Sequence, residues 1–195
     1  MLARLDREMG AHHSELVRGW TRLLNSNLAR EDYVHQLATT YGFEAPYEAA
    51  CQYTPGLVQV VDLRGRWRSG LIAQDLLTLG WTPDEITKVK CRSASPFQDA
   101  AEALGWMYIV ERATLFHLDV RDALAERYVD LSRASAYLAA YERSVSRRWG
   151  ELGIALDRLA TSQGVAHRIV DAAKNAFAAL REWERASAPG LRSVG

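Results

Sequence analysis

Apolar residues recur along this chain at intervals of three and four positions, and this helical spacing restricts the fold more than any other feature. Near the N-terminus, Leu5, Met9, Leu16, Trp20 and Leu23 fall on one face of a helix. No stretch shows the alternating apolar and polar residues of a half-buried strand between hairpin turns. The sequence therefore predicts an all-α fold, and its 195 residues are enough for one domain with a single core.

Turn-forming residues indicate where these helices end. We expect the asparagine-rich stretch at residues 25–27 to end the first helix. The Tyr-Thr-Pro-Gly sequence at 53–56 is expected to end a second helix, which begins near Arg30 and is kinked at Pro46. Gly80 is the predicted C-cap of a third helix.

Two sites at which a threonine or serine is followed by a proline indicate where helices begin. Thr82, Pro83 and Glu85 have the order of an N-cap, a first-turn proline and a capping-box acid. The same order at residues 95–98 predicts the start of a long helix that includes residues 104–124. The rest of the chain is expected to form two helices, at residues 135–161 and 165–186, which are separated by Gly164. A flexible tail is expected at residues 188–195. Residues 1–187 then form the domain.

Charge and cysteine content exclude several classes of protein. The chain has 24 basic and 24 acidic residues, which gives no electrostatic reason to expect nucleic acid or an anionic membrane as a partner. No apolar run is long enough to span a bilayer, and the N-terminus lacks the apolar core of a signal peptide. Cys51 and Cys91 have no metal-binding spacing. We therefore expect a cytoplasmic protein with reduced thiols.

Three histidines are candidates for a site. His117 lies at the centre of the long apolar helix, and a buried histidine that bonds to a carbonyl or carboxylate is a more common explanation for this than a ligand. His12 and His13 flank the apolar face of the first helix, from which a side chain can reach inward or stay partly exposed.

Other chemical motifs are absent from the sequence. It contains no nucleotide-binding glycine motif, no zinc-protease motif and no nucleophile elbow. Glu15, Glu111 and His117 could together contribute to a di-iron carboxylate site within a helical bundle. The Glu-x-x-His pair that marks such sites does not occur here.

Several blocks of sequence are similar to one known family. The stretch Tyr-Gly-Phe-Glu-Ala-Pro-Tyr-Glu at residues 41–48 resembles the Tyr-Gly-Phe-Tyr-x-Pro-Leu-Glu stretch of bacterial heme oxygenases of the type associated with bacteriophytochromes. Further blocks resemble the same family and follow in its order: residues 71–80, 103–115, 141–149 and 172–183. The resemblance implies a heme oxygenase-like helical bundle, which binds heme between the first helix and the helix that contains residues 104–124.

The resemblance also implies a proximal iron ligand. In the family this histidine commonly lies eight residues after a leucine, and His13 follows Leu5 at that spacing, with His12 as the second choice. A neutral imidazole is a good iron ligand when its other nitrogen has a partner that fixes the tautomer. The implied lining of the heme pocket is Met9, Leu16 and Phe177.

The helix over the other face of the heme departs from the family. Members carry Glu-Gly-Ser-x-Leu-Gly-Gly there, and this chain has Glu-Arg-Ala-Thr-Leu-Phe-His at residues 111–117. Phe116 and His117 replace the two glycines that approach the iron-bound oxygen, and Ala113 replaces the aspartate that mammalian-type members use to order a distal water. A distal His117 would coordinate the iron opposite His13 and exclude oxygen, whereas Phe116 would narrow the pocket.

Three functions are consistent with these observations. The first is a heme oxygenase that takes electrons from a donor such as ferredoxin and produces biliverdin, carbon monoxide and iron. The second is a catalytically impaired member that binds heme or another tetrapyrrole as a carrier or sensor. The third is a relative with a non-heme di-iron centre or without a cofactor. The candidates for pairing with the heme propionates are Arg7, Arg147, Arg148 and Lys174.

Overall fold

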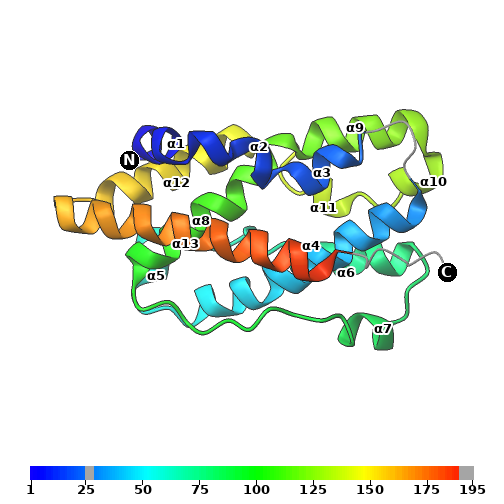
Figure 1. Ribbon diagram of the computed structural model, residues 1–195, viewed down its shortest axis with the longest axis horizontal. Coiled ribbons are helices and arrows are strands. Elements are labelled where there is room, and N and C mark those ends of the chain that lie inside the picture. Colours follow the sequence, from blue (N-terminus) through cyan, green and yellow to red (C-terminus); the bar gives the residue numbers. More distant parts are fainter. Residues whose placement is uncertain (25–28, 189–195) are drawn as a thin grey trace.

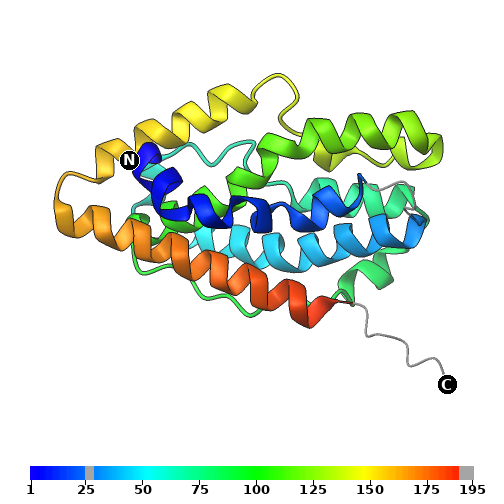
Figure 2. The same cartoon turned by 45° about the horizontal axis from the view of Figure 1, so that its top comes forward.

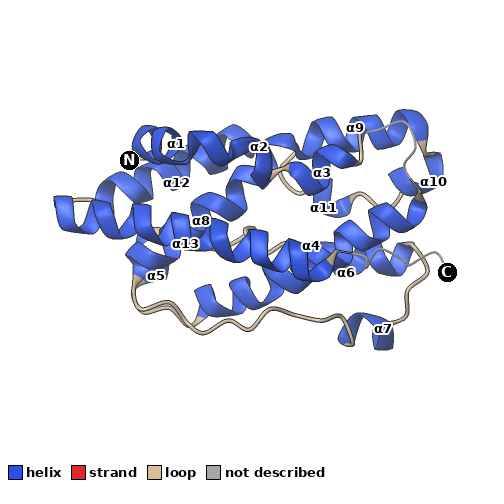
Figure 3. Cartoon of the chain, in the orientation of Figure 1, coloured by secondary structure: helices blue, strands red, loops and turns tan. Residues whose placement is uncertain are grey.

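The computed structural model describes residues 1–24 and 29–188, and within these residues it contains helices and loops but no strand (Figure 3). This confirms the predicted all-α single domain. The expected end of the first helix at residues 25–27, and residues 189–195 of the expected tail, lie outside the described residues.

The first helix is interrupted rather than continuous. It consists of α1 (Leu2–Met9), a 3₁₀ turn (Gly10–His12), α2 (His13–Leu16) and α3 (Arg18–Arg22). Gly10 lies at the first interruption, and glycine is a poor helix former because its backbone is so free in the unfolded chain. The interruptions do not alter the predicted inward face: its five apolar residues are all buried.

The next helices begin and end largely where their capping residues predict. They are α4 (Arg30–Gln52), α5 (Leu57–Val60), α6 (Ser69–Thr78) and α7 (Pro83–Thr87), and α4 continues through Pro46. After α6, Gly80 has a φ of 88°, and the Trp81 N–H bonds to the Leu76 carbonyl at 3.0 Å, as in a Schellman motif. Thr82 and Glu85 form the predicted capping box.

The long apolar helix starts later than its sequence pattern suggests. It is α8 (Ala100–Ala113), and its N-cap is Asp99, whose carboxylate accepts from the Ala101 and Glu102 N–H groups at 2.9 and 3.0 Å. The prediction of a start at residues 95–98 is wrong because Phe97 is buried in the core, with its N–H bonded to Thr54 Oγ1 at 3.2 Å. A 3₁₀ turn (Thr114–Phe116) then separates α8 from α9 (His117–Arg127).

The C-terminal part also differs from its prediction. Its helices are α10 (Val129–Ser132), α11 (Ala136–Ala139), α12 (Val145–Leu159) and α13 (Gln163–Ser187). The helix expected at 135–161 is therefore divided between α11 and α12. Gly164 does not separate two helices but lies in the first turn of α13, whose N-cap Ser162 accepts from the Val165 N–H at 3.3 Å.

The core has two parts, and α4 contributes buried residues to both. The first part is formed by α1, α8, α12 and α13, and α13 packs along α8 more extensively than any other pair of described helices does. The second part is formed by α3, α4, α6, α9 and α11. Figures 1 and 2 show α13 running along the length of the molecule, and α1 and α2 both contact it. The junction of these elements surrounds the candidate site.

Candidate functional site

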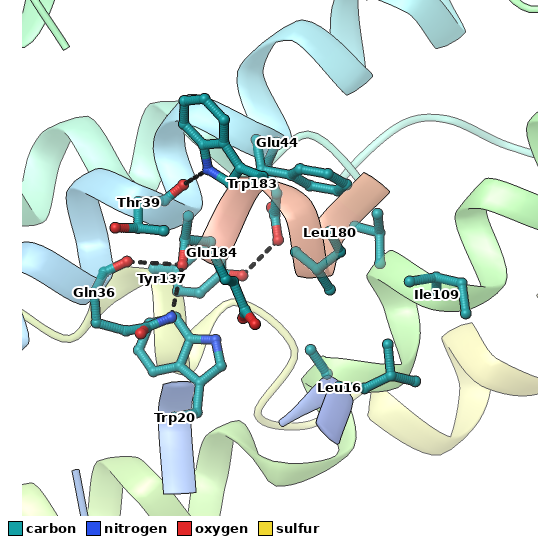
Figure 4. A pocket seen from close by; sticks show the side chains of 14 residues that line it. Leu16, Trp20, Gln36, Thr39, Glu44, Ile109, Tyr137, Leu180, Trp183 and Glu184 are labelled. Carbon is teal, nitrogen blue, oxygen red and sulfur yellow. Dashed lines mark hydrogen bonds between the residues drawn. The ribbon is translucent and has the colours of Figure 1, made fainter. Parts of the chain in front are cut away.

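A pocket lies where the first helical segment, α4, α8 and α13 meet (Figure 4). Leu16 of α2 and Trp20 of α3 line it, and α8 contributes Ile109, Val110 and Ala113. The first helical segment and α8 thus both line this pocket. The cavity has a volume of about 40 Å³, which is room for a few water molecules. The other lining residues are Gln36, Thr39, Thr40, Phe43, Glu44, Tyr137, Leu180, Trp183 and Glu184.

Glu44 is the polar group at the inner side of this pocket. One of its carboxylate oxygens, Oε1, accepts from Tyr137 Oη at 2.6 Å and from Arg68 Nη2 at 3.2 Å. The other oxygen, Oε2, is buried and has no hydrogen-bond partner among the residues that the structure describes. Burial raises the pKa of this carboxyl to about 7, although the Arg68 cation acts in the opposite direction. Glu44 therefore lines the pocket with a buried carboxyl group that protonates near neutral pH.

A buried network of charges surrounds Glu44, and sequence reasoning missed it. Arg68 is 1 % exposed and lies against the rings of Tyr137 and Tyr141. Nearby, Glu111 pairs with Arg66 at 3.0 Å and accepts from Tyr141 Oη at 3.1 Å. Buried arginines are rare unless they are paired, and no local pattern in the sequence marks these two for burial. Their partners lie on α4, on α8, on α11 and in the turn after α11, so only the tertiary fold reveals the network.

A second hollow, of about 230 Å³ and rich in arginine, lies next to the pocket and shares Gln36, Thr39 and Glu184 with it. Glu184 lines both spaces, and burial raises its pKa to about 7 against the effect of the nearby arginines. Glu15 pairs with Arg181 at 3.1 Å and with Arg18 at 3.6 Å. We call four residues of this hollow the arginine mouth: Arg18, Arg22, Arg181 and Arg185. Because only two glutamates oppose these four cations, the net charge of the hollow is at least +2.

His13 does not line this pocket, and both of its ring nitrogens are engaged. Arg112 Nη2 lies 3.2 Å from Nδ1, and Tyr108 Oη lies 3.2 Å from Nε2. A guanidinium can only donate, so Nδ1 accepts and Nε2 carries the proton. Burial, and then the Arg112 cation, lower the pKa of His13, which keeps the ring neutral. In this arrangement no lone pair of His13 is left for a metal ion.

His117 is a core histidine that lies next to the pocket. It is 4 % exposed, and its ring centre lies 4.7 Å from that of Tyr137 and 5.5 Å from that of Trp20, both of which line the pocket. Burial, together with the Arg68 cation, lowers its pKa well below the usual value, so the ring is neutral. The Nε2 atom of His117 is buried and finds no hydrogen-bond partner within the described part of the chain. The structure gives His117 and His13 no shared contact, so it does not bring the two predicted iron ligands together.

The other predicted site residues lie around the pocket rather than all within it. Met9, Leu16 and Phe177 belong to one part of the core, but only Leu16 lines the pocket. His12 packs its ring on Phe177, with 4.5 Å between the ring centres. Phe116 is partly buried against the same part of the core.

The basic residues suggested by the sequence do not form the arginine mouth. Arg147 and Arg148 pair with Glu151, and Lys174 pairs with Glu8. Arg7 is exposed at the end of α1 and does not line the mouth. The sequence does contain a signal for the four residues that form the arginine mouth. Arg18 and Arg22 are one helical turn apart, and so are Arg181 and Arg185.

The residues of this site match some parts of a heme group and not others. The apolar and aromatic lining beside a cationic mouth matches in kind the ring and the two carboxylates of a tetrapyrrole, but the cavity of about 40 Å³ is too small for the ring. The heme iron has no histidine ligand here, because neither His13 nor His117 lines the pocket and both ring nitrogens of His13 are hydrogen-bonded. A di-iron site has even less support, since the described residues contain no group of three His, Cys, Asp or Glu side chains that could hold a metal ion.

Comparisons of the chain with protein-family models, with curated proteins and with solved structures found no match. The assignment of a function therefore depends on the site itself. In the part of the chain that the structure describes, no helix combines the length and the apolar composition needed to cross a membrane.

Proposed function

We propose that this chain is a heme oxygenase-like protein that binds a tetrapyrrole, with the ring in the pocket between the first helical segment and α8. The observation that carries the proposal is the position of the arginine mouth directly beside an aromatic pocket, with Glu184 lining both. The sequence blocks that resemble bacterial heme oxygenases support the same class of ligand.

Each part of the site matches one part of such a ligand. Trp20, Phe43 and Trp183 offer ring faces and apolar area to a flat conjugated body. The arginine mouth offers guanidinium groups to the two side-chain carboxylates, for which arginine is the preferred partner. The ring is larger than the described cavity, so binding requires side chains between the pocket and the mouth to move, as interface side chains commonly do.

Binding without cleavage is better supported than a full oxygenase reaction. Iron coordination by His13 remains a prediction of the resemblance, and it requires Arg112 or Tyr108 to release a ring nitrogen. Production of biliverdin, carbon monoxide and iron, with electrons from a donor such as ferredoxin, is the second candidate function. The break between α8 and α9 at residues 114–116 favours it, because this interruption lies where the family's distal glycines are replaced.

Titration of the purified protein with hemin and with biliverdin tests the proposal. Trp20 and Trp183 line the pocket, so a bound tetrapyrrole is expected to quench tryptophan fluorescence. The dimethyl ester of biliverdin is the matched control, because it keeps the ring system and lacks both carboxylates. We expect saturable binding of the free acids and much weaker binding of the ester. Absence of saturable quenching by either free acid would refute the proposal, and biliverdin formation from hemin with a reductant would favour the second candidate.

A further inference from the structure

Two cations of the arginine mouth lack an ionic partner. Arg22 on α3 and Arg185 on α13 line the same hollow, and neither forms an ion pair or a hydrogen bond with the side chains that the structure describes. Glu15, by contrast, is shared between Arg181 and Arg18, at 3.1 and 3.6 Å. Guanidinium groups that line one hollow repel each other, and an anion bound between them removes that repulsion.

The hollow has the size and the charge for a small anion. Its volume is about 230 Å³, several times the share of about 30 Å³ that a water molecule takes in the liquid, so a phosphate group fits. Glu184, the second acid of the hollow, opposes an anion only weakly. Burial raises its pKa to about 7, so this carboxyl group is partly protonated near neutral pH.

We propose that the arginine mouth binds a phosphate group, free or as a monoester, with Arg22 and Arg185 as its main contacts. A phosphate dianion carries the charge of two guanidinium groups, and its oxygens accept from the paired N–H groups of arginine. A single carboxylate has one charge and two oxygens, so it satisfies only one guanidinium in this way. The inference goes beyond the proposed function, because a phosphate group needs no ring in the neighbouring pocket.

The double variant Arg22→Gln with Arg185→Gln tests this reasoning. It removes both unpaired cations, and it leaves Glu15 with both of its arginine partners. Arg143→Gln with Arg158→Gln is the matched control. Both of these arginines are exposed and lie outside the hollow, and the net charge changes by the same amount. The control therefore measures the effect of net charge alone on anion binding.

The experiment is isothermal titration at about pH 7.5, where phosphate is mainly a dianion, and at low ionic strength, which limits screening. The probes are inorganic phosphate, glycerol phosphate and acetate. Both phosphates should bind the wild type saturably and more tightly than acetate, and the tighter of the two identifies the source of the group. The double variant should bind them about tenfold or more weakly, and the control should bind them as the wild type does.

Several results would overturn the inference: no saturable binding of either phosphate, acetate binding as tightly as phosphate, or equal weakening in the double variant and the control. If the double variant loses its helical circular dichroism spectrum, NMR of the arginine Nε–H groups of the wild type decides. Phosphate should shift the signals of Arg22 and Arg185 and not that of Arg143, and a missing shift would overturn the inference.

Failure of this inference is distinguishable from failure of the proposed function. Binding of biliverdin without binding of either phosphate would leave the proposed function intact and remove the phosphate site. Binding of phosphate without binding of any tetrapyrrole would do the opposite. If both ligands bind, phosphate should compete with biliverdin, because its carboxylates need the same cations. Simultaneous, independent binding of the two would contradict a shared arginine mouth.

Discussion

Gly105 lies where α8 packs tightly against α13, and replacing it by alanine should separate the two helices. A Cβ atom at this position would lie 2.5 Å from the Ile169 carbonyl oxygen, 2.6 Å from the Ala172 Cβ and 2.9 Å from the Ala173 nitrogen. Two of these three atoms are backbone, so they cannot turn aside as the end of a long side chain could. The helices must move apart along the central contact of the core.

Two opposing effects set the magnitude. Overpacking of a core costs about 1–3 kcal/mol, and contact with backbone atoms places Gly105→Ala at the upper end of that range. The higher helix propensity of alanine returns up to about 1 kcal/mol. The free energy of unfolding should therefore fall by about 2 kcal/mol.

Gly150→Ala in α12 is the matched control. A Cβ at Gly150 meets no atom of the described residues within 4 Å, so only the helix propensity changes, and the variant should gain about 0.5–1 kcal/mol. Urea unfolding followed by circular dichroism measures both variants, with the dependence on urea checked for a constant slope. A Gly105→Ala protein as stable as Gly150→Ala would refute the close packing of α8 on α13.

Buried titratable groups give three further predictions. The lowered pKa of His117 means that only the unfolded chain gains a proton below about pH 6.5, so stability should fall by up to about 1.4 kcal/mol per pH unit, and His117→Leu should remove this slope in urea unfolding. The raised pKa of Glu184, about 7, means that unfolding releases a proton between about pH 4.5 and 7. Stability should thus fall as pH rises through this range, but not in Glu184→Gln. Arg112→Leu should raise the pKa of His13 in an NMR titration, because it removes a nearby cation; an unchanged or lower pKa would contradict the contact.

Local signals in the sequence were sufficient for many helix boundaries. The Schellman motif at Gly80 and the capping box of Thr82 and Glu85 involve neighbours in the chain, so their residue types alone predict them. The start of α8 was mispredicted because Phe97 is drawn into the core and Asp99 supplies the cap instead. Tertiary burial therefore overrode a local pattern of equal quality.

The candidate site was only partly predictable for the same physical reason. The periodic apolar pattern places Leu16 and Ala113 on inward faces, and both line the pocket. The burial of Arg68 depends on Glu44 and Tyr137, which are 24 and 69 positions away in the chain. His13 was expected to reach a ligand, but its partners Tyr108 and Arg112 belong to a different face of α8 from the pocket. Side-chain pairing between distant helices has no signature in a single sequence.

The most direct test of the account is the affinity for biliverdin of a protein that lacks part of the arginine mouth. The double variant Arg22→Ala with Arg181→Ala removes one cation from each of the two helices, and Arg143→Ala removes an exposed arginine that does not line the mouth. The account predicts binding about tenfold or more weaker in the double variant, from the loss of charge-assisted hydrogen bonds, and unchanged binding in Arg143→Ala. Equal affinity of the double variant and the wild type would contradict the central claim that this mouth holds the ligand's carboxylates.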